Sequence, residues 1–261
     1  MGWSKLFPSV SALAFVLSPL VVLTSVNAVR AQINFNAPAG DVGRPASSMG
    51  GGTRAGGACT TGGQLQALMP LPNNIGRSIS QTPDLFWYVP QTVAKTAELV
   101  LTDNDKNELY VAELALPGKP GIVKVTIPES AKLEVGQEYE WQLALVCDPG
   151  DRASDKFVVG KVAIVEETPQ LETALAAATT PVEKATAYAQ AGVWQETVSS
   201  LAGVSSQYPQ QWQELVQSAL RSALAVDQMQ PPQQAEAIEA IKTIATAPVV
   251  APQVESYDSG N

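Results

Sequence analysis

The sequence predicts an α+β protein of two units, an antiparallel β-sandwich followed by a small all-α unit of helical hairpins. Seven short strand-like runs lie between residues 64 and 165, with turn-forming residues at regular intervals between them. After residue 167 the chain changes to alanine- and glutamine-rich segments with helical spacing. With 261 residues, 45% of them hydrophobic, the chain is long enough for one sizeable core and a second small unit.

Residues 1–31 predict a signal peptide. Lys5 precedes an apolar run over residues 6–26, and the small residues at 29–31 form a cleavage exit that makes Gln32 the expected mature start. A cut after Ala28 and an uncleaved anchor are the alternatives, but prolines interrupt the run. No later stretch is apolar over the length of a membrane span. We therefore expect export to the periplasm or to the extracellular space, with no membrane span once the signal is removed.

Residues 32–58 predict a flexible arm, because their Gly, Pro, Ser and Asn content cannot bury a core. The glycines at 50–52 and 56–57 suggest a phosphate-binding loop as an alternative. Such a loop needs a preceding strand, a following helix and a Lys-Ser pair, all of which are missing from the sequence here. The arm is the favoured interpretation.

Residues 59–167 predict the β-sandwich domain. Its expected strands are residues 65–69, 85–89, 97–102, 109–116, 122–127, 139–147 and 157–165. In residues 138–147 the odd positions are apolar throughout, whereas the even positions are polar at first and apolar at the end. This pattern predicts a central strand that begins half exposed and ends covered on both faces.

This strand ends in one of two cysteines, Cys147, and the other is Cys59. In an exported chain they have only each other as intramolecular partners, which predicts a disulfide bond. A free-thiol nucleophile is the alternative. It lacks activation, because the chain has no histidine.

Residues 168–247 predict an α-helical region, and residues 248–261 predict a disordered polar tail. The expected helices are residues 171–178, 182–191, 193–202, 212–225 and 233–247. Prolines in the first helical turn start four of them. Five short helices cannot bury all of their apolar faces against one another. We therefore expect them to pack partly on the sandwich or on a partner.

Two local patterns resemble known folds. Residues 133–141, Leu-x-x-Gly-x-x-Tyr-x-Trp, resemble the corner before the sixth strand of immunoglobulin and fibronectin type III sandwiches. This resemblance implies that the hydroxyl of Tyr139 bonds to the backbone just upstream and that Trp87 is the core tryptophan. Residues 188–202 resemble the centre of one tetratricopeptide repeat, with a glycine in the turn between two helices.

A wider set of motifs runs along the chain in a fixed order. The motifs are Gly-Gly-Thr-Arg before a cysteine (51–59), Leu-x-Ala-Leu-x-Pro (65–70), Phe-Trp-Tyr-Val-Pro (86–90), Pro-Gly-Ile (120–122), the Gly-x-x-Tyr-x-Trp strand that ends in cysteine, and Tyr-Ala-x-x-Gly-Val-Trp (188–194). Together they resemble the cyanobacterial secreted family called domain of unknown function 928, and the resemblance covers about residues 51–225. That family brings no established activity, so the resemblance implies a fold and a compartment but no reaction.

Composition argues against several functions. The absence of histidine removes the usual general base near neutral pH, Ser-His-Asp and Cys-His arrangements, and imidazole metal ligands. With 25 acidic and 16 basic residues, the chain repels nucleic acid and anionic lipid. The turn Asp103-x-Asp105-x-Asn107 begins like a calcium loop, but Glu108 and Leu114 stand where such a loop needs its glycine and its closing glutamate. We expect a hairpin turn there, no metal site and no cofactor.

Paired carboxylates remain as a catalytic device, and they occur at residues 138 and 140, 148 and 151, and 166 and 167. Each pair lies at a strand start, a turn or a linker, where solvated carboxylates are common. Trp87 and Tyr88 are the candidate contact residues, because neighbours in a strand face opposite sides and one of them must leave the core or lie under the helices.

These observations together favour a non-enzymatic protein of the cell envelope that binds a protein or an envelope polymer. A carboxylate-dependent glycoside hydrolase and a purely structural envelope component are the alternatives.

Overall fold

The computed structural model describes residues 1–3, 33–35, 59–70 and 75–257. The chain divides into two compact units, Met1–Arg30 and Ala31–Asn261. Of the first unit only residues 1–3 are described, and they have no regular secondary structure. The predicted signal peptide therefore lies almost entirely outside the described residues. The helices and strands belong to the second unit.

The second unit has a mixed α+β fold, as the sequence predicted. Its strands are β1 (Thr60–Thr61), β2 (Gln66–Ala67), β3 (Ile75–Ser78), β4 (Asp84–Val89), β5 (Gln91–Thr92), β6 (Thr96–Thr102), β7 (Glu108–Ala115), β8 (Gly121–Thr126), β9 (Glu138–Leu145), β10 (Lys156–Ile164), β11 (Val249–Val250) and β12 (Gln253–Tyr257). Its α-helices are α1 (Pro169–Ala177), α2 (Pro181–Gln190), α3 (Trp194–Ala202), α4 (Pro209–Ala223) and α5 (Pro231–Thr246). The expected helices and strands are all present, with ends within a few residues of those predicted.

The described strands form two larger sheets and one small pair. The six-stranded sheet has the order β12-β7-β6-β9-β10-β3, the four-stranded sheet has the order β11-β8-β4-β2, and β1 pairs with β5. Most neighbours are antiparallel, as expected. Two pairs are parallel, β3 with β10 and β11 with β8. Both parallel pairs involve short edge strands that the sequence patterns did not predict.

The two larger sheets contribute to one core. Trp87 of β4 and Trp141 of β9 are fully buried and pack edge to face, with ring centroids 5.4 Å apart. The odd positions of β9 from Tyr139 to Leu145 are buried, and Ala144 near its end is buried on the opposite face. The predicted central strand, covered on both faces toward its end, is thus confirmed.

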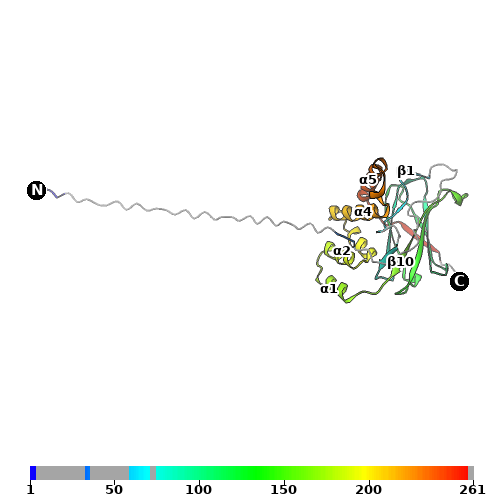
Figure 1. The fold of residues 1–261 in the computed structure, drawn as a ribbon, viewed down its shortest axis with the longest axis horizontal. Coiled ribbons are helices and arrows are strands. Elements are labelled where there is room, and N and C mark those ends of the chain that lie inside the picture. The colour runs from blue at the N-terminus through cyan, green and yellow to red at the C-terminus, as the bar shows by residue number, and fades with distance from the viewer. Residues whose placement is uncertain (4–32, 36–58, 71–74, 258–261) are drawn as a thin grey trace. The chain divides into compact units, whose positions relative to one another are not determined.

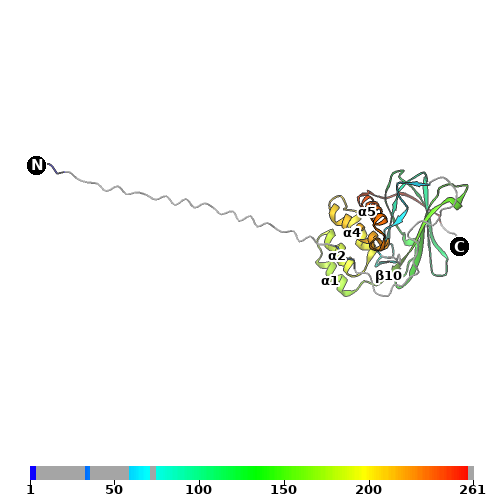
Figure 2. The ribbon, with the colours of Figure 1, turned by 45° about the horizontal axis from the view of Figure 1, so that its top comes forward.

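Strand β4 is covered on both faces, and this determines where the helices lie. Trp87 points toward the six-stranded sheet, whereas Asp84 accepts a hydrogen bond from Ser199 of α3 at 3.0 Å. Alternate residues of a strand share a face, so Phe86 and Tyr88 lie on the helix side as well. Figures 1 and 2 show the helices gathered on one side of the sheets.

The helices are started by local signals and held by the sheets. Proline occupies the first turn of α1, α2, α4 and α5, as predicted, and Thr180 forms a capping box with Glu183 at the start of α2. Buried residues of α3, α4 and α5 belong to the same hydrophobic cluster as those of both sheets. The expectation that the helices pack on the strand-forming region is therefore confirmed.

The disulfide bond between Cys59 and Cys147 is confirmed, with their Cα atoms 5.5 Å apart. It joins the start of β1 to the segment after β9. The corner before β9 also has the expected contact, because the backbone N–H of Glu134 donates to the hydroxyl of Tyr139 at 2.8 Å. Gly136 takes the positive φ of 86° that this turn requires.

One prediction about the ends of this unit is wrong, and a second is tested only at residues 33–35. Residues 248–261 were expected to be disordered, but Val249 and Val250 extend the four-stranded sheet and residues 253–257 pair with β7 of the six-stranded sheet. The arm, 32–58, was expected to be flexible, and among its described residues Ile33 is buried and Phe35 packs edge to face on Trp194 at 5.1 Å. The rest of the arm, from residue 36, lies outside the described residues. In both places a few apolar side chains pack against a free sheet edge or into a groove. The composition of the whole segment does not predict these contacts, because most of its residues are polar or small.

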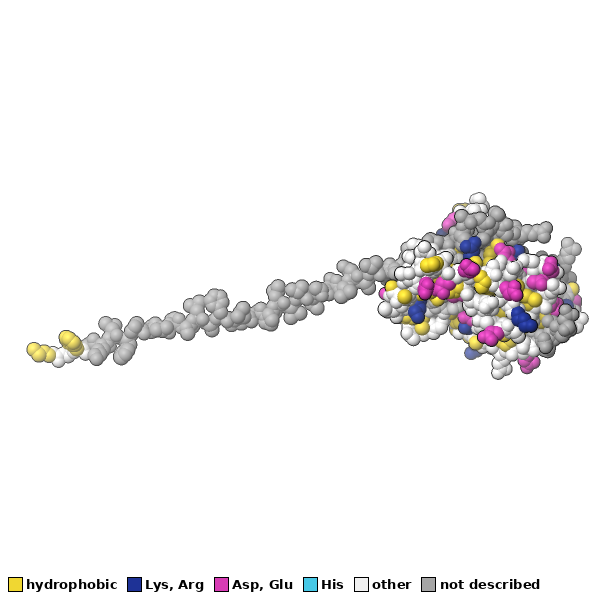
Figure 3. Space-filling model, turned by 90° about the horizontal axis from the view of Figure 1, so that it is seen from below, with side chains coloured by type: hydrophobic (Ala, Val, Ile, Leu, Met, Phe, Trp, Pro, Cys, Tyr) yellow, Lys and Arg dark blue, Asp and Glu magenta, His cyan; other side chains and the backbone are white. Residues whose placement is uncertain are grey.

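Among the described helices, none is long and apolar enough to cross a membrane. Acidic side chains are spread over the face shown in Figure 3, with fewer basic ones between them. This surface agrees with the formal net charge of −9.

Candidate functional site

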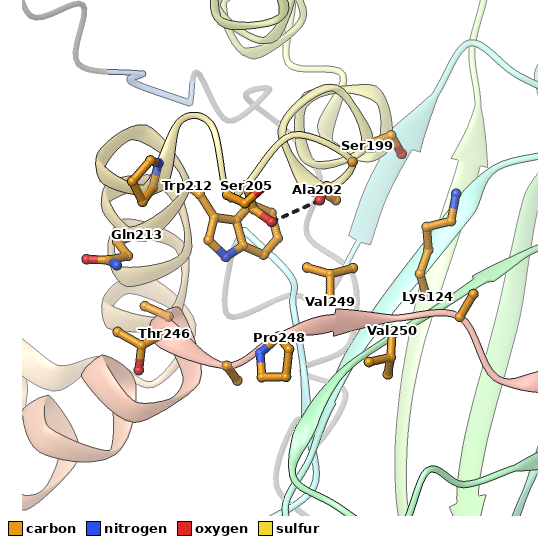
Figure 4. A pocket seen from close by; sticks show the side chains of 16 residues that line it. Lys124, Ser199, Ala202, Ser205, Trp212, Gln213, Thr246, Pro248, Val249 and Val250 are labelled. Atoms are coloured by element: carbon orange, nitrogen blue, oxygen red, sulfur yellow. Dashed lines mark hydrogen bonds between the residues drawn. The ribbon is translucent and has the colours of Figure 1, made fainter.

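A cavity of about 650 Å³ lies on the helix side of the four-stranded sheet. Its walls are the end of α3 and the loop after it, the start of α4, the end of α5 and the segment of β11. Strand β8 contributes Lys124 (Figure 4). We call this space the helix–sheet cavity. Its volume is within the usual range of small-molecule sites.

One end of the helix–sheet cavity is charged and held by hydrogen bonds. The ammonium of Lys124 lies 2.9 Å from Oδ2 of Asp84, and Ser199 donates to the same carboxylate oxygen at 3.0 Å. Thr126 donates to Oδ1 of Asp84. Three donors therefore fix this carboxylate beneath the lysine, and the lysine keeps two further N–H groups for other acceptors.

The middle of the helix–sheet cavity is apolar. Trp212 of α4 lies opposite Val249 and Pro248, with its indole nitrogen turned toward the segment of β11 (Figure 4). Trp212 is only 3% exposed, so its ring face is packed inside the protein. Ser205 lies beside it and donates to the carbonyl of Ala202 at 3.1 Å.

The lining of the helix–sheet cavity differs in charge from the rest of the protein. Lys124 is the charged residue in that lining, which contains no aspartate or glutamate. The whole chain, by contrast, carries 25 acidic residues against 16 basic ones. The cavity therefore offers an ammonium, hydroxyls, an amide and an indole N–H around an apolar middle. This set of groups is suited to binding, but it contains no proton donor of the carboxylic acid kind.

The sequence-predicted contact residues do not lie in this cavity. Trp87 is 0% exposed and Tyr88 is 3% exposed. Trp87 belongs to the core between the sheets, and Tyr88 takes the covered position under the helix side of β4. Burial raises the pKa of the Tyr88 hydroxyl. The structure gives neither side chain an open face for a ligand.

Two of the three sequence-local carboxylate pairs have separate structural partners, and the third is exposed. Glu138 pairs with Lys161 and Glu140 pairs with Lys106, across the exposed face of β9. Asp148 accepts from the N–H of Gly150 in the turn after the disulfide, whereas residues 166 and 167 are exposed in the linker before α1. Asp151 caps the short turn that follows it by accepting from Ala153.

The calcium-like turn is a hairpin turn. Asp103 accepts hydrogen bonds from the backbone N–H groups of Asp105 and Asn107, both at 2.9 Å, and from the side-chain amide of Asn107 at 2.8 Å. These bonds, with the Asn107 side chain first, lower the pKa of Asp103. Within the described ranges no cluster of three or more acidic or cysteine side chains is arranged to hold a metal ion.

Sequence reasoning missed a buried carboxylate where α3 meets the sheet. Oε1 of Glu196 accepts from the Ser78 hydroxyl at 2.5 Å and from the backbone N–H groups of Ile79 and Ser80 at 3.1 and 3.2 Å. Its other oxygen is buried without a partner, and burial raises the pKa of Glu196. The nearby Trp194 donates to the carbonyl of Leu68 at 2.9 Å. The spacing of Trp194 and Glu196 in the sequence gave no indication of these contacts, because both partners lie far back in the chain.

Comparison with known proteins gives one family and no individual relative. Neither the curated proteins nor the solved structures include a significant match to this chain. A family model described as Domain of Unknown Function (DUF928) matches residues 49–229, which is more than half of the chain. The matched region runs from just before the disulfide through α4, so α5 and β11, which complete the helix–sheet cavity, follow it. By this match, the chain belongs to the DUF928 family.

Proposed function

We propose that this protein is an exported, non-enzymatic binding protein of the cell envelope and that the helix–sheet cavity is its ligand site. The observation that carries the proposal is the composition of that cavity. A fixed ammonium at one end, an apolar middle and neutral polar groups around it supply affinity and orientation. The lining has no carboxylic acid or thiol with which to start a reaction.

Export is supported by chemistry at the disulfide. Disulfide bonds persist in oxidising compartments, and Cys59 and Cys147 form one. The signal-like sequence of residues 1–31 agrees with this compartment. These features, together with the family resemblance, support a periplasmic or extracellular location in a cyanobacterial envelope as part of the proposal.

We also infer an immunoglobulin- or fibronectin type III-like sandwich with a tetratricopeptide-like helical hairpin. The bond from Glu134 to the hydroxyl of Tyr139 supports the first likeness, because such a corner is typical of those sandwiches. The second is supported by α2 and α3, which lie on either side of Gly192 with its φ of 71°. In this arrangement the sheets act as the scaffold and the helices form most of the cavity wall.

The test is retention of an envelope ligand by the mature, oxidised chain. Gly203 lines the cavity, and a Cβ atom added there would meet no atom within 4 Å. Gly203→Phe should therefore fold normally and occupy the cavity, and Gly203→Ala is the matched control that leaves it open. We expect wild type and Gly203→Ala to retain the same molecules from fractionated envelope extracts, and Gly203→Phe to lose them. Equal retention by all three, or none by any, would contradict the proposed site.

A second cavity is lined by acidic side chains and is therefore the place to test the hydrolase alternative. Asp103, Asp105, Glu134 and Glu138 are among the residues that line a space of about 290 Å³ beside the corner before β9. Hydrogen bonds keep Asp103 charged, which suits a base or nucleophile, but an inverting or retaining hydrolase also needs a protonated acid opposite it. Release of reducing sugar from envelope polysaccharide, abolished by Asp103→Asn, would establish this alternative. A purely structural component would show neither retention nor turnover.

A further inference from the structure

We propose that the ligand of the helix–sheet cavity is a small organic carboxylate with an apolar body, whose carboxylate binds Lys124. This inference rests on the proposed function and names the chemical class that the same site takes. Four features of the cavity lead to it.

The first feature is that the charged side chain in the lining is an ammonium. In a chain with an excess of acidic residues, the cavity lining carries Lys124 and no carboxylate, because Asp84, the ion-pair partner of Lys124, lies outside the lining. An anion in this space can accept from the N–H groups that Lys124 does not use toward Asp84. A cation would be repelled by the same ammonium and would find no carboxylate in the lining, so the lining favours an anionic head group.

The second feature is the way Lys124 is held. Its partner Asp84 already accepts from Ser199 and Thr126, so the carboxylate stays in place without any ligand. Lys124 uses one N–H toward Asp84, and its nitrogen lies at the Ser199 end of the cavity (Figure 4). The remaining N–H groups are positioned in advance, which lowers the ordering cost of binding. One ammonium can neutralise the charge of one carboxylate, but it would leave most of the charge of a polyanion without a partner.

The third feature is the apolar surface next to this charge. Val249, Pro248, Ala202 and Ala247 line the cavity around Trp212. Burial of an apolar body against them releases water from both surfaces. The indole N–H of Trp212 adds one donor within this apolar region, where it would suit a second acceptor atom of the ligand.

The fourth feature argues against a sugar as the occupant. Sugar sites present an open aromatic face, but Trp212 is only 3% exposed and its ring face is packed. They also present carboxylates or amides that bind vicinal hydroxyls. Here Asp84 already accepts from three donors and lies outside the lining, in which Gln213 is the amide side chain. A neutral polyol would offer the Lys124 ammonium hydroxyl oxygens but no negative charge.

The experiment uses decanoate as the probe, with decanol and decyltrimethylammonium as matched ligands of the same chain length. Affinities for the mature, oxidised protein are measured by calorimetry below the micellar range of each probe. We expect decanoate to bind about tenfold or more tightly than decanol, as a charge-assisted hydrogen bond implies, and the cation to bind most weakly. Glucose and galactose should not bind.

Two variants separate the charge from the cavity itself. Lys124→Gln keeps a donor toward Asp84 and should remove the preference for decanoate, while decanol binding stays unchanged. Lys161→Gln, which alters a lysine paired with Glu138 on the other sheet, is the matched control and should behave as wild type. Gly203→Phe should weaken decanoate and decanol together.

The outcomes also separate this inference from the proposed function. Equal affinity for decanoate and decanol, a preference for the cation or a sugar, or a Lys124→Gln variant with wild-type preference would overturn the carboxylate assignment. If Gly203→Phe still abolished retention from envelope extracts in that case, the cavity would remain the ligand site for another class of molecule. If Gly203→Phe changed neither binding nor retention, both proposals would be rejected.

Discussion

Gly160 of β10 is the position where a single methyl group has the clearest calculable effect. It lies opposite Trp141 of β9, and a Cβ atom built there would be 2.2 Å from Cζ2 of that indole and 2.8 Å from two further ring atoms. Carbon atoms in contact prefer about 3.5–4 Å, so the ring would have to move by more than about 1 Å. It cannot move freely, because Trp87 packs against it at 5.4 Å. Gly160→Ala should therefore destabilise the fold.

The magnitude follows from opposing contributions. Overpacking of a core costs about 1–3 kcal/mol, and partial loss of the tryptophan pair costs up to about 1.5 kcal/mol. Replacing a strand glycine by alanine returns about 0.5–1 kcal/mol through chain entropy. We expect a net loss of about 2 kcal/mol in the free energy of unfolding, or a drop of about 4–8 °C in Tm.

The assay is urea unfolding followed by tryptophan fluorescence, with Gly203→Ala as the control. A Cβ at Gly203 meets open space, so that variant should stay within about 0.5 kcal/mol of wild type. The sign of the effect is decisive. A Gly160→Ala protein as stable as wild type, or more stable, would mean that the indole of Trp141 does not occupy this position and that the side chains between the sheets pack in another way.

Three further predictions concern stability. Replacing Cys59 and Cys147 by serine opens a loop with a sequence separation of 88 and should cost about 4.6 kcal/mol in the chain-entropy view, measured by denaturation of variant and wild type under oxidising conditions. Tyr139→Phe removes the acceptor of the Glu134 N–H and should cost about 1 kcal/mol in the same assay. The raised pKa of Glu196 means that its stabilising contribution is fully present below its ordinary value of 4.5 and is lost as pH rises through the folded-state value. Glu196→Gln, which keeps an acceptor for its three donors, should therefore gain stability relative to wild type between pH 4 and pH 7.

Each of these predictions has an outcome that contradicts it. A serine pair that costs less than about 1 kcal/mol would show that the disulfide does not constrain the unfolded chain as assumed. Tyr139→Phe with wild-type stability would remove the energetic role of the corner, and Tyr139→Leu serves as the comparison that also loses packing. A Glu196→Gln variant whose stability runs parallel to wild type across the pH range would show that this carboxyl titrates normally.

Local patterns were sufficient for most of the fold. The alternation in residues 138–147 predicted a strand with one buried face, because the side-chain period of a strand is independent of its neighbours. Proline likewise predicts the first turn of a helix without reference to distant residues, because its ring holds the backbone angle φ near the helical value. The disulfide followed from elimination, because two cysteines leave one pairing.

Features that depend on distant partners could not be predicted in this way. Two-residue β11 carries no periodic pattern, and its position is fixed only by the exposed edge of β8. Ile33 and Phe35 are two apolar residues in a largely polar stretch, and the burial of Ile33 depends on a groove formed by α3 and α4. The helix–sheet cavity likewise combines Lys124 with segments more than seventy positions later in the chain. No local rule relates these segments.

The segment of residues 248–257 crosses from one sheet to the other, pairing first with β8 and then with β7. It is synthesised after every other wall of the helix–sheet cavity. The helix–sheet cavity is therefore complete only when this segment pairs with β8. Loss of residues 248–257 would remove one wall of the helix–sheet cavity and one edge strand from each of the two larger sheets.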